Sequence, residues 1–192
     1  MPCVGTYRIT LDDASSIEPL NAVVKRYGGP LNWASYTAEV VVEKEDGTVE
    51  LAATSTGVTA HPTQAFTLDS TNNWIACNAH GAEVHDIWVP STSGSLSGTG
   101  LTAAVRYKIV EKDVDWLRVA LTSGAQPITI AGAGTGTHSA YILGSVQFAP
   151  AAAQLDTPGT YRVWFRAKSG SDVFHYPIGQ DYFELRIETR GN

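Results

Sequence analysis

The densest group of side chains able to do chemistry lies late in the first half of the chain. Within ten residues the sequence supplies one thiol, two imidazoles and two carboxylates, from Cys77, His80, Glu83, His85 and Asp86. These are the groups that bind zinc and other transition metals. The histidines are separated across a glycine, however, and no second cluster with CxxC or HExxH spacing supplies the remaining ligands. We interpret the segment as a polar turn between strands and expect no metal, with Cys77 packed as a small hydrophobic residue.

Nucleophilic catalysis has no better support. Serines, aspartates and five histidines are present, but no serine lies in a Gly-x-Ser-x-Gly elbow between a strand and a helix. Acidic residues fall in turns or on the polar side of alternating strands, which does not indicate the paired carboxylates of a glycosidase. The run Gly132–Gly136 lacks the following helix of a phosphate-binding loop, because residues 137–141 read as strand. We therefore predict no catalytic residue, no cofactor and no enzymatic activity.

Five tryptophans offer a different chemistry, which is contact with a sugar ring or with a protein. They stand at Trp33, Trp74, Trp88, Trp116 and Trp164. Exposed aromatic rings of β-sandwich proteins can stack on sugars, whereas most buried tryptophans are core residues. Trp164 attracts attention because it lies between two arginines in an alternating strand.

The alternation separates the two faces of that strand. Tyr161, Val163 and Phe165 share one face, and successive side chains of a strand point to opposite sides. If these three face the core, then Arg162, Trp164 and Arg166 form an outward row. Because tryptophan and arginine are enriched at the centres of protein interfaces, we favour an interface over a sugar platform. The acidic first half of another copy is one candidate partner.

The composition favours strands over helices. The 192 residues are 43% apolar and 17% charged, with 18 glycines and a single methionine. Short alternating segments recur between turn signals, which is typical of an all-β sandwich or barrel. The clearest is the pair on either side of Asp46-Gly47, where Ala38, Val40 and Val42 alternate with polar residues. A long strand is predicted over Tyr141–Phe148.

The C-terminal region adds two further strands. Asp172–Tyr176 and Tyr182–Glu188 are predicted as a terminal hairpin-like pair, and the turn Thr157-Pro-Gly feeds the strand that holds Trp164.

The domain organisation is predicted from a break in this pattern. Residues 91–100 are rich in serine and glycine, and strands resume after them. We expect a β-sandwich module over residues 1–90, a linker or long loop over 91–100, and a second module over 101–192. Two tandem sandwiches and one elaborated sandwich both remain open.

Charge and apolar patterning exclude several classes of function. The net charge is −6, with 4 basic and 11 acidic residues in positions 1–100 and 9 and 8 afterwards. No segment is basic enough to hold nucleic acid. No apolar run approaches the ~20 residues that cross a bilayer. The N-terminus lacks the basic and apolar regions of a signal peptide, so we expect synthesis in the cytoplasm, with Cys3 and Cys77 reduced.

From residue 101 onward the order of features resembles a known family. Leu101-Thr-Ala-Ala-Val-Arg-Tyr-Lys-Ile opens a strand, and Gly144-Ser-Val-Gln-Phe-Ala-Pro leads to Thr157-Pro-Gly-Thr-Tyr-Arg-Val-Trp-Phe. A proline turn then precedes Asp181-Tyr-Phe-Glu-Leu-Arg-Ile. This order is similar to the immunoglobulin-like β-sandwich of tailed-bacteriophage virion proteins, notably the N-terminal domain of baseplate upper proteins. The segment from Leu31 to Val49 matches the pattern more faintly.

The resemblance implies a structural role in a virion, in the tail, baseplate, neck or capsid-decoration class, with no catalytic residue to carry over. Partners would be other virion proteins and further copies of this chain. The alternative is a carbohydrate-binding β-sandwich that attaches to host glycans. A third reading is an enzyme built around His80 and His85.

Overall fold

The computed structural model describes residues 3–10, 19–26, 29–78, 81–122, 126–151, 154–155, 157–177 and 181–188. Within these residues the chain is all-β, and its one helical element is the short 3-10 helix η1 (Trp33–Ser35). The described part holds no helix with the length and hydropathy of a membrane span. The expectation of an all-β protein is confirmed.

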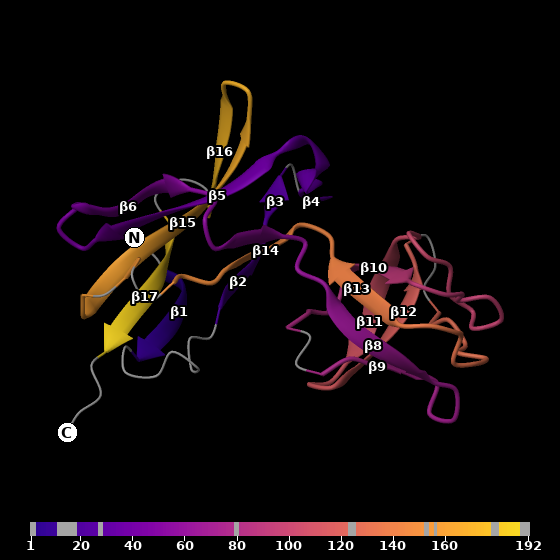
Figure 1. The fold of residues 1–192 in the computed structure, drawn as a ribbon. Coiled ribbons are helices and arrows are strands. Elements are labelled where there is room, and N and C mark those ends of the chain that lie inside the picture. Colours follow the sequence, from indigo (N-terminus) through magenta and orange to yellow (C-terminus); the bar gives the residue numbers. More distant parts are fainter. Residues whose placement is uncertain are drawn as a thin grey trace. The chain divides into compact units, whose positions relative to one another are not determined.

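The chain divides into two compact units. Unit 1 comprises the described residues up to Ala60 and those from Gly144 onward, and unit 2 is the continuous segment His61–Leu143. Unit 2 is therefore an insertion within unit 1, and the chain passes between the units twice (Figure 1). The prediction of two modules that meet at residues 91–100 placed the boundaries wrongly. Those residues lie wholly inside unit 2.

Unit 1 contains two sheets and a small hairpin. The first sheet has the order β1–β17–β15–β5–β6, with β16 also beside β15, and the second has the order β2–β14–β7. β1 runs parallel to β17, and the other pairs are antiparallel. The strands are β1 (Cys3–Thr10), β2 (Leu20–Val23), β3 (Lys25–Arg26), β4 (Gly29–Pro30), β5 (Thr37–Lys44), β6 (Val49–Thr54), β7 (Val58–Ala60), β14 (Ser145–Phe148), β15 (Gly159–Ser169), β16 (Asp172–Tyr176) and β17 (Tyr182–Glu188).

One hydrophobic core joins the two sheets of unit 1. Phe148 of β14 and Leu20 of β2 belong to the same buried cluster as Val40 of β5 and Phe165 of β15. The alternation in β5 places Ala38, Val40 and Val42 in this core, as the sequence predicts. One face of the larger sheet is therefore packed against this core, and the opposite face carries the polar side chains.

The turn at Asp46-Gly47 forms the predicted hairpin between β5 and β6. Gly47 has a φ of +85°, which glycine adopts without steric cost. The Thr48 N–H donates to Asp46 Oδ1 at 2.8 Å, and the Gly47 N–H donates to the Lys44 carbonyl oxygen at 3.0 Å. The tip of this hairpin is therefore fixed by its own hydrogen bonds.

The C-terminal strands pair differently from the prediction. Asp172–Tyr176 and Tyr182–Glu188 are both strands, but they do not pair with each other. β16 pairs with Arg166 and its neighbours in the second part of β15, and β17 pairs with the first part, from Gly159 to Val163. The long strand β15 thus has β5 along one side and two successive strands along the other.

Unit 2 is a closed six-stranded barrel with the order β10–β11–β12–β9–β8–β13. Its core includes Ile75, Trp88, Tyr107 and Leu117. The predicted sandwich for the second module is thus wrong for this unit. The strands are β8 (Gln64–Asp69), β9 (Trp74–Ala76), β10 (Ile87–Thr92), β11 (Tyr107–Lys112), β12 (Trp116–Leu121) and β13 (His138–Ile142).

Residues 91–100 are part of the barrel and not a linker. Their first two residues belong to β10, Leu96 and Thr99 are buried, and Ser95 forms a β-bridge with Thr135. A Cβ on Gly94 would lie 2.2 Å from the Thr135 carbonyl oxygen. The glycine is needed there because two backbones approach closely, which a composition-based interpretation as a flexible linker misses.

The strand predicted over Tyr141–Phe148 is two strands, because the chain leaves unit 2 between them. β13 ends at Ile142 in the barrel, and β14 begins at Ser145 in unit 1. Gly144 lies between them with a φ of +85°, and a Cβ at this position would lie 2.7 Å from the Val24 carbonyl oxygen.

Unit 1 is expected to fold without unit 2. It has its own core, and Ala60 is paired with Val146, so both ends of the insertion leave from adjacent strands. Replacing residues 61–143 by an Asn-Gly turn should therefore close β7 and β14 into a hairpin. Cooperative thermal unfolding and slow amide exchange in β15 would show the fold is retained. A shortened chain that unfolds without cooperativity would contradict this expectation.

Candidate protein interface

The predicted row on β15 lies on the sheet face opposite the core. Tyr161, Val163 and Phe165 are at most 1% exposed, which confirms that they face the core. Arg162, Trp164 and Arg166 are each part-exposed. Together with the outward residues of β5 and β17, they form what we call the outer face. Its members are Glu39, Val41, Glu43, Arg162, Trp164, Arg166, Lys168, Tyr182 and Glu184.

An apolar stripe crosses the middle of the outer face. Trp164 is paired with Val41 of β5, and its ring meets that of Tyr182 edge-on at 6.2 Å between centroids. The indole N–H donates to the Asp181 carbonyl oxygen at 2.7 Å. This bond fixes the ring orientation, so the stripe Val41–Trp164–Tyr182 is a preformed surface.

Charged pairs border the stripe on both sides. On one side, Arg166 Nε lies 3.6 Å from Glu39 Oε2, and these side chains are only 20% and 14% exposed. On the other, the Arg162 guanidinium carbon lies 5.2 Å from the centroid of the Tyr182 ring. Glu184, next to Arg162 in the sheet, accepts a hydrogen bond from Arg186. An apolar centre with a charged border is the usual arrangement of a protein interface.

Three of these charged atoms are shielded from water without a hydrogen bond. They are Arg162 Nε, Arg166 Nε and Glu39 Oε2, and none has a hydrogen-bond partner among the described residues. The Arg166–Glu39 contact, at 3.6 Å, is an ion pair that is too long for a hydrogen bond. Shielding a charged group from water without a hydrogen bond costs free energy of folding, unless a hydrogen-bonding or charged partner compensates it.

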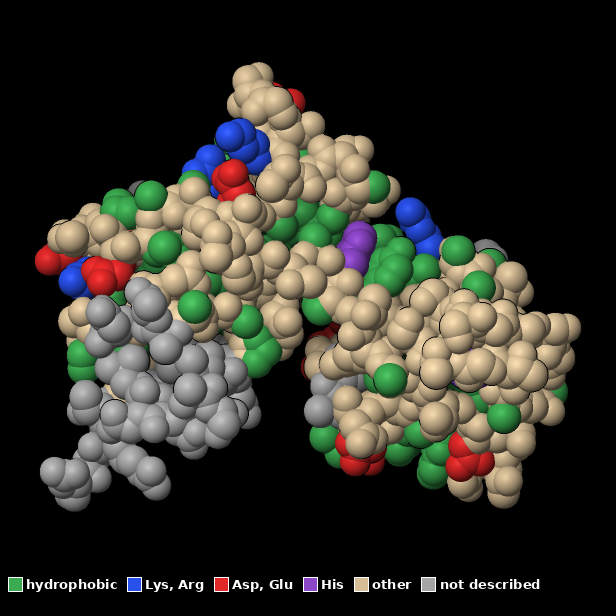
Figure 2. Space-filling model, in the orientation of Figure 1, with side chains coloured by type: hydrophobic (Ala, Val, Ile, Leu, Met, Phe, Trp, Pro, Cys, Tyr) green, Lys and Arg blue, Asp and Glu red, His purple; other side chains and the backbone are tan. Residues whose placement is uncertain are grey.

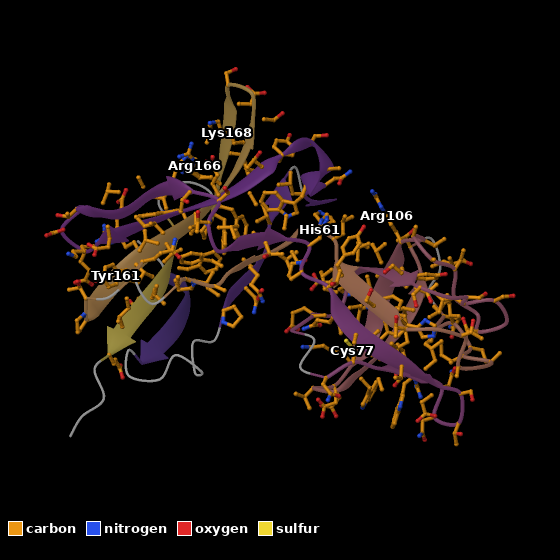
Figure 3. All side chains as sticks on the ribbon, viewed as in Figure 1. His61, Cys77, Arg106, Tyr161, Arg166 and Lys168 are labelled. Carbon is orange, nitrogen blue, oxygen red and sulfur yellow. The ribbon has the colours of Figure 1, made fainter. Side chains whose placement is uncertain are left out.

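The end of the outer face next to β16 is basic. Figure 2 shows Lys and Arg side chains gathered beside an acidic one there, and Figure 3 labels Arg166 and Lys168 at this place. Lys168 is exposed and forms no ion pair with a described residue. Desolvation, and then the Arg166 charge, lower the pKa of His175 below its usual value. His175 is therefore neutral at pH 7, and the positive charge comes from Arg166 and Lys168.

Sequence patterns predict only the β15 part of this surface. Val41 and Tyr182 are far from Trp164 in the sequence, and strand pairing brings them beside it. The alternation in β5 does place Glu39, Val41 and Glu43 on one face. What the pattern lacks is the information that β5 lies next to β15.

The segment from Cys77 to Asp86 forms no metal site in the part that the structure describes. His80 lies outside the described residues. Glu83 pairs with Lys112 at 2.8 Å, and Asp86 accepts a hydrogen bond from the Glu83 N–H at 2.9 Å. Among the described residues no three His, Cys, Asp or Glu side chains are placed to hold a metal ion. Glu83 and Asp86 thus stabilise the turn that precedes β10.

Cys77 is expected to react slowly with thiol reagents in the native protein. Its side chain is 3% exposed, and burial raises the pKa of the thiol, so that little of the reactive thiolate is present near neutral pH. In a Cys3→Ser background, a disulfide reagent should label Cys77 only as the barrel opens. Labelling in native buffer at the rate seen in denaturant would contradict this.

The tryptophans divide between core and surface. Trp33 and Trp88 are buried in the cores of units 1 and 2. Trp74 and Trp116 stand on the outside of the barrel, because their neighbours Ile75 and Leu117 point into its core. Their rings stack at 5.1 Å with an angle of 15°.

The glycine run at residues 132–136 is a loop of the barrel, and it leads into a strand and not into a helix. Thr135 forms the bridge to Ser95, and the next element is the strand β13. A phosphate-binding loop needs a helix N-terminus at this point.

No match to this chain is found among known protein families, curated proteins or solved structures.

Proposed function

We propose that this chain is a non-enzymatic structural component of a tailed-phage virion, of the tail, baseplate, neck or capsid-decoration class. It acts through protein–protein contacts and localises to the particle after synthesis in the host cytoplasm. The observation that carries the contact role is the outer face, with its fixed apolar stripe between charged borders. The virion assignment depends on the family resemblance of the C-terminal half.

We further propose that unit 1 is an immunoglobulin-like sandwich. In that fold strands B, E and D form one sheet and strands C, F and G the other. Here β2, β14 and β7 correspond to strands B, E and D in one sheet. In the other sheet β5, β15 and β17 correspond to strands C, F and G. The Tyr161 hydroxyl donates to the Thr157 carbonyl oxygen at 2.6 Å, near the start of β15. This supports the proposal, because a tyrosine that bonds back to the backbone at the start of strand F is a hallmark of the fold.

The virion role can be tested on purified particles. Gold-labelled antibody against this chain should bind at one defined, symmetry-related position of the particle in negative-stain images. Mass spectrometry of the same particles should find the chain in many copies. Its absence from purified particles would overturn the proposal.

The contact role has its own test. Trp164→Ala should reduce incorporation into particles, because interface tryptophans commonly contribute about 2 kcal/mol or more to binding. Val114→Ala is the matched control, because Val114 is 65% exposed but belongs to unit 2 and not to the outer face. Equal incorporation of both variants and the wild type would overturn the contact role.

A second candidate function, glycan attachment, is favoured by the barrel tryptophans. Trp74 and Trp116 stack outside the core, and the Arg118 guanidinium carbon lies 5.8 Å from the centroid of the Trp116 ring. Aromatic rings beside fixed polar groups are common in sugar sites. Binding to a glycan array that is lost in Trp116→Ala but kept in Trp164→Ala would support this function. An array with no binding by the wild type would exclude it for the glycans tested.

A further inference from the structure

The outer face is poorly suited to bind a copy of itself. A two-fold axis between two such faces lies in the plane of the interface. If the axis runs along β15, each arginine of the row lies over the same arginine of the second copy. If the axis runs across β15, Arg162 lies near Arg166 of the second copy. Both arrangements bring like charges together, which costs binding energy. The occupant must therefore present a different surface, and the charge of Lys168, beside the Arg166–Glu39 ion pair, favours an acidic one.

Unit 1 carries such a surface at the tip of the β5–β6 hairpin. The acidic tip, residues Glu45–Val49, exposes Glu45, Asp46 and the apolar side chain of Val49, which is 53% exposed. Lys44, the basic residue next to the tip, is held by Glu50 at 2.9 Å. Figure 2 shows acidic side chains gathered at this end of unit 1. An exposed valine beside two carboxylates complements a tryptophan beside two basic residues.

The tip is also preorganised for binding. Its turn is closed by the hydrogen bonds from Thr48 to Asp46 and from Gly47 to Lys44. The Thr48 N–H lowers the pKa of Asp46, so its carboxylate is charged at neutral pH. A surface that is already ordered loses little conformational entropy when it binds.

The tip cannot reach the basic end of its own sheet. Lys168 is paired with Thr37 at the start of β5, whereas the tip follows Lys44 at the end of that strand. At about 3.3 Å per residue, the two lie roughly 25 Å apart along the strand. The contact therefore joins two molecules.

We infer that the acidic tip of one copy docks on Trp164, Arg166 and Lys168 of the next copy. This inference rests on the proposed function, because it names the partner of the outer face. The contact joins two different surfaces, so it repeats head to tail and produces a ring or a filament. Val49 contacts the Trp164 ring, and the carboxylates of Glu45 and Asp46 pair with Lys168 and Arg166.

The test uses two half-blocked variants of the full chain. Lys168→Glu blocks the outer face, and Glu45→Gln with Asp46→Asn neutralises the tip, since asparagine retains the oxygen that accepts from Thr48. In sedimentation velocity at low salt, the wild type should form larger species as concentration rises. Each variant alone should remain monomeric. An equimolar mixture should stop at a heterodimer, because only one competent contact remains.

A charge exchange and a matched control sharpen the test. The chain that carries both Lys168→Glu and Glu45→Lys should regain association. The control neutralises the β11–β12 tip with Asp113→Asn and Asp115→Asn. That tip flanks Val114, which is 65% exposed, so it has the same chemistry in the other unit. Association of the control should equal that of the wild type. Thermal unfolding of each variant confirms that these exposed substitutions leave the fold intact.

The outcomes separate this inference from the proposed function. A wild type that stays monomeric at every concentration, or tip variants that associate normally, would overturn the docking of a second copy. Loss of association in the control would overturn it too, because the β11–β12 tip would then be the occupant. If Trp164→Ala still failed to enter particles in any of these cases, the outer face would bind another virion protein and the proposed function would stand.

Discussion

Phe165→Ala is expected to lower the free energy of unfolding of unit 1 by about 3–5 kcal/mol, the usual cost of emptying a phenylalanine site in a core. Phe165 is fully buried and meets Phe183 edge-on at 5.9 Å between ring centroids. Urea unfolding of the full chain measures the decrease in the free energy of unfolding. Amide hydrogen exchange then shows whether the decrease is in unit 1.

The neighbouring Trp164→Ala is the matched control, because it removes a larger side chain from the other face of the same strand. It should cost about 1–2 kcal/mol, from the hydrogen bond to Asp181 and the edge contact with Tyr182. Equal losses in the two variants would contradict the assignment of the strand's faces. The contrast also sets the stability baseline against which the assembly defect of Trp164→Ala is judged.

Gly94→Ala should destabilise unit 2 by about 3 kcal/mol, at the upper end of the usual cost of overpacking. The added methyl group would lie 2.2 Å from the Thr135 carbonyl oxygen, and the opposing atoms are backbone. To make room, the loops must separate and weaken the paired hydrogen bonds between Ser95 and Thr135, at 3.0 and 2.8 Å. Chemical unfolding of the barrel measures the loss.

Gly132→Ala provides the control in a glycine-rich loop of the same unit. The nearest atom to its added methyl group is 3.6 Å away, and its φ is not in the left-handed region, so the change should stay within about 0.5 kcal/mol. The native chain should also resist proteolysis at residues 91–100. Rapid cleavage there, or a harmless Gly94→Ala, would restore the interpretation of a flexible linker.

Several features of this protein follow from local sequence. The alternation in β5 and β15 sets which side chains face the core, because successive residues of a strand point to opposite sides whatever strand lies beside them. The β5–β6 turn follows from Asp46-Gly47, because glycine adopts the required backbone conformation at little cost. The all-β class and the outward position of Arg162, Trp164 and Arg166 therefore needed no tertiary structure.

The pairing of strands and the division into units depend on contacts between residues far apart in the chain. Local patterns do not show that β5 and β17 flank β15, so Val41 and Tyr182 could not be placed beside Trp164. They also do not show that β7 and β14 are neighbours, which permits the barrel to be inserted between them.

The glycines of residues 91–100 illustrate the same limit. A serine- and glycine-rich segment has one composition whether it is a free linker or a tightly packed loop. The difference at Gly94 is the Thr135 carbonyl oxygen, forty-one residues away in the sequence. Sequence determined which residues can form strands and turns and which faces they present, while tertiary structure decided their partners, because pairing and close packing are set by non-local contacts.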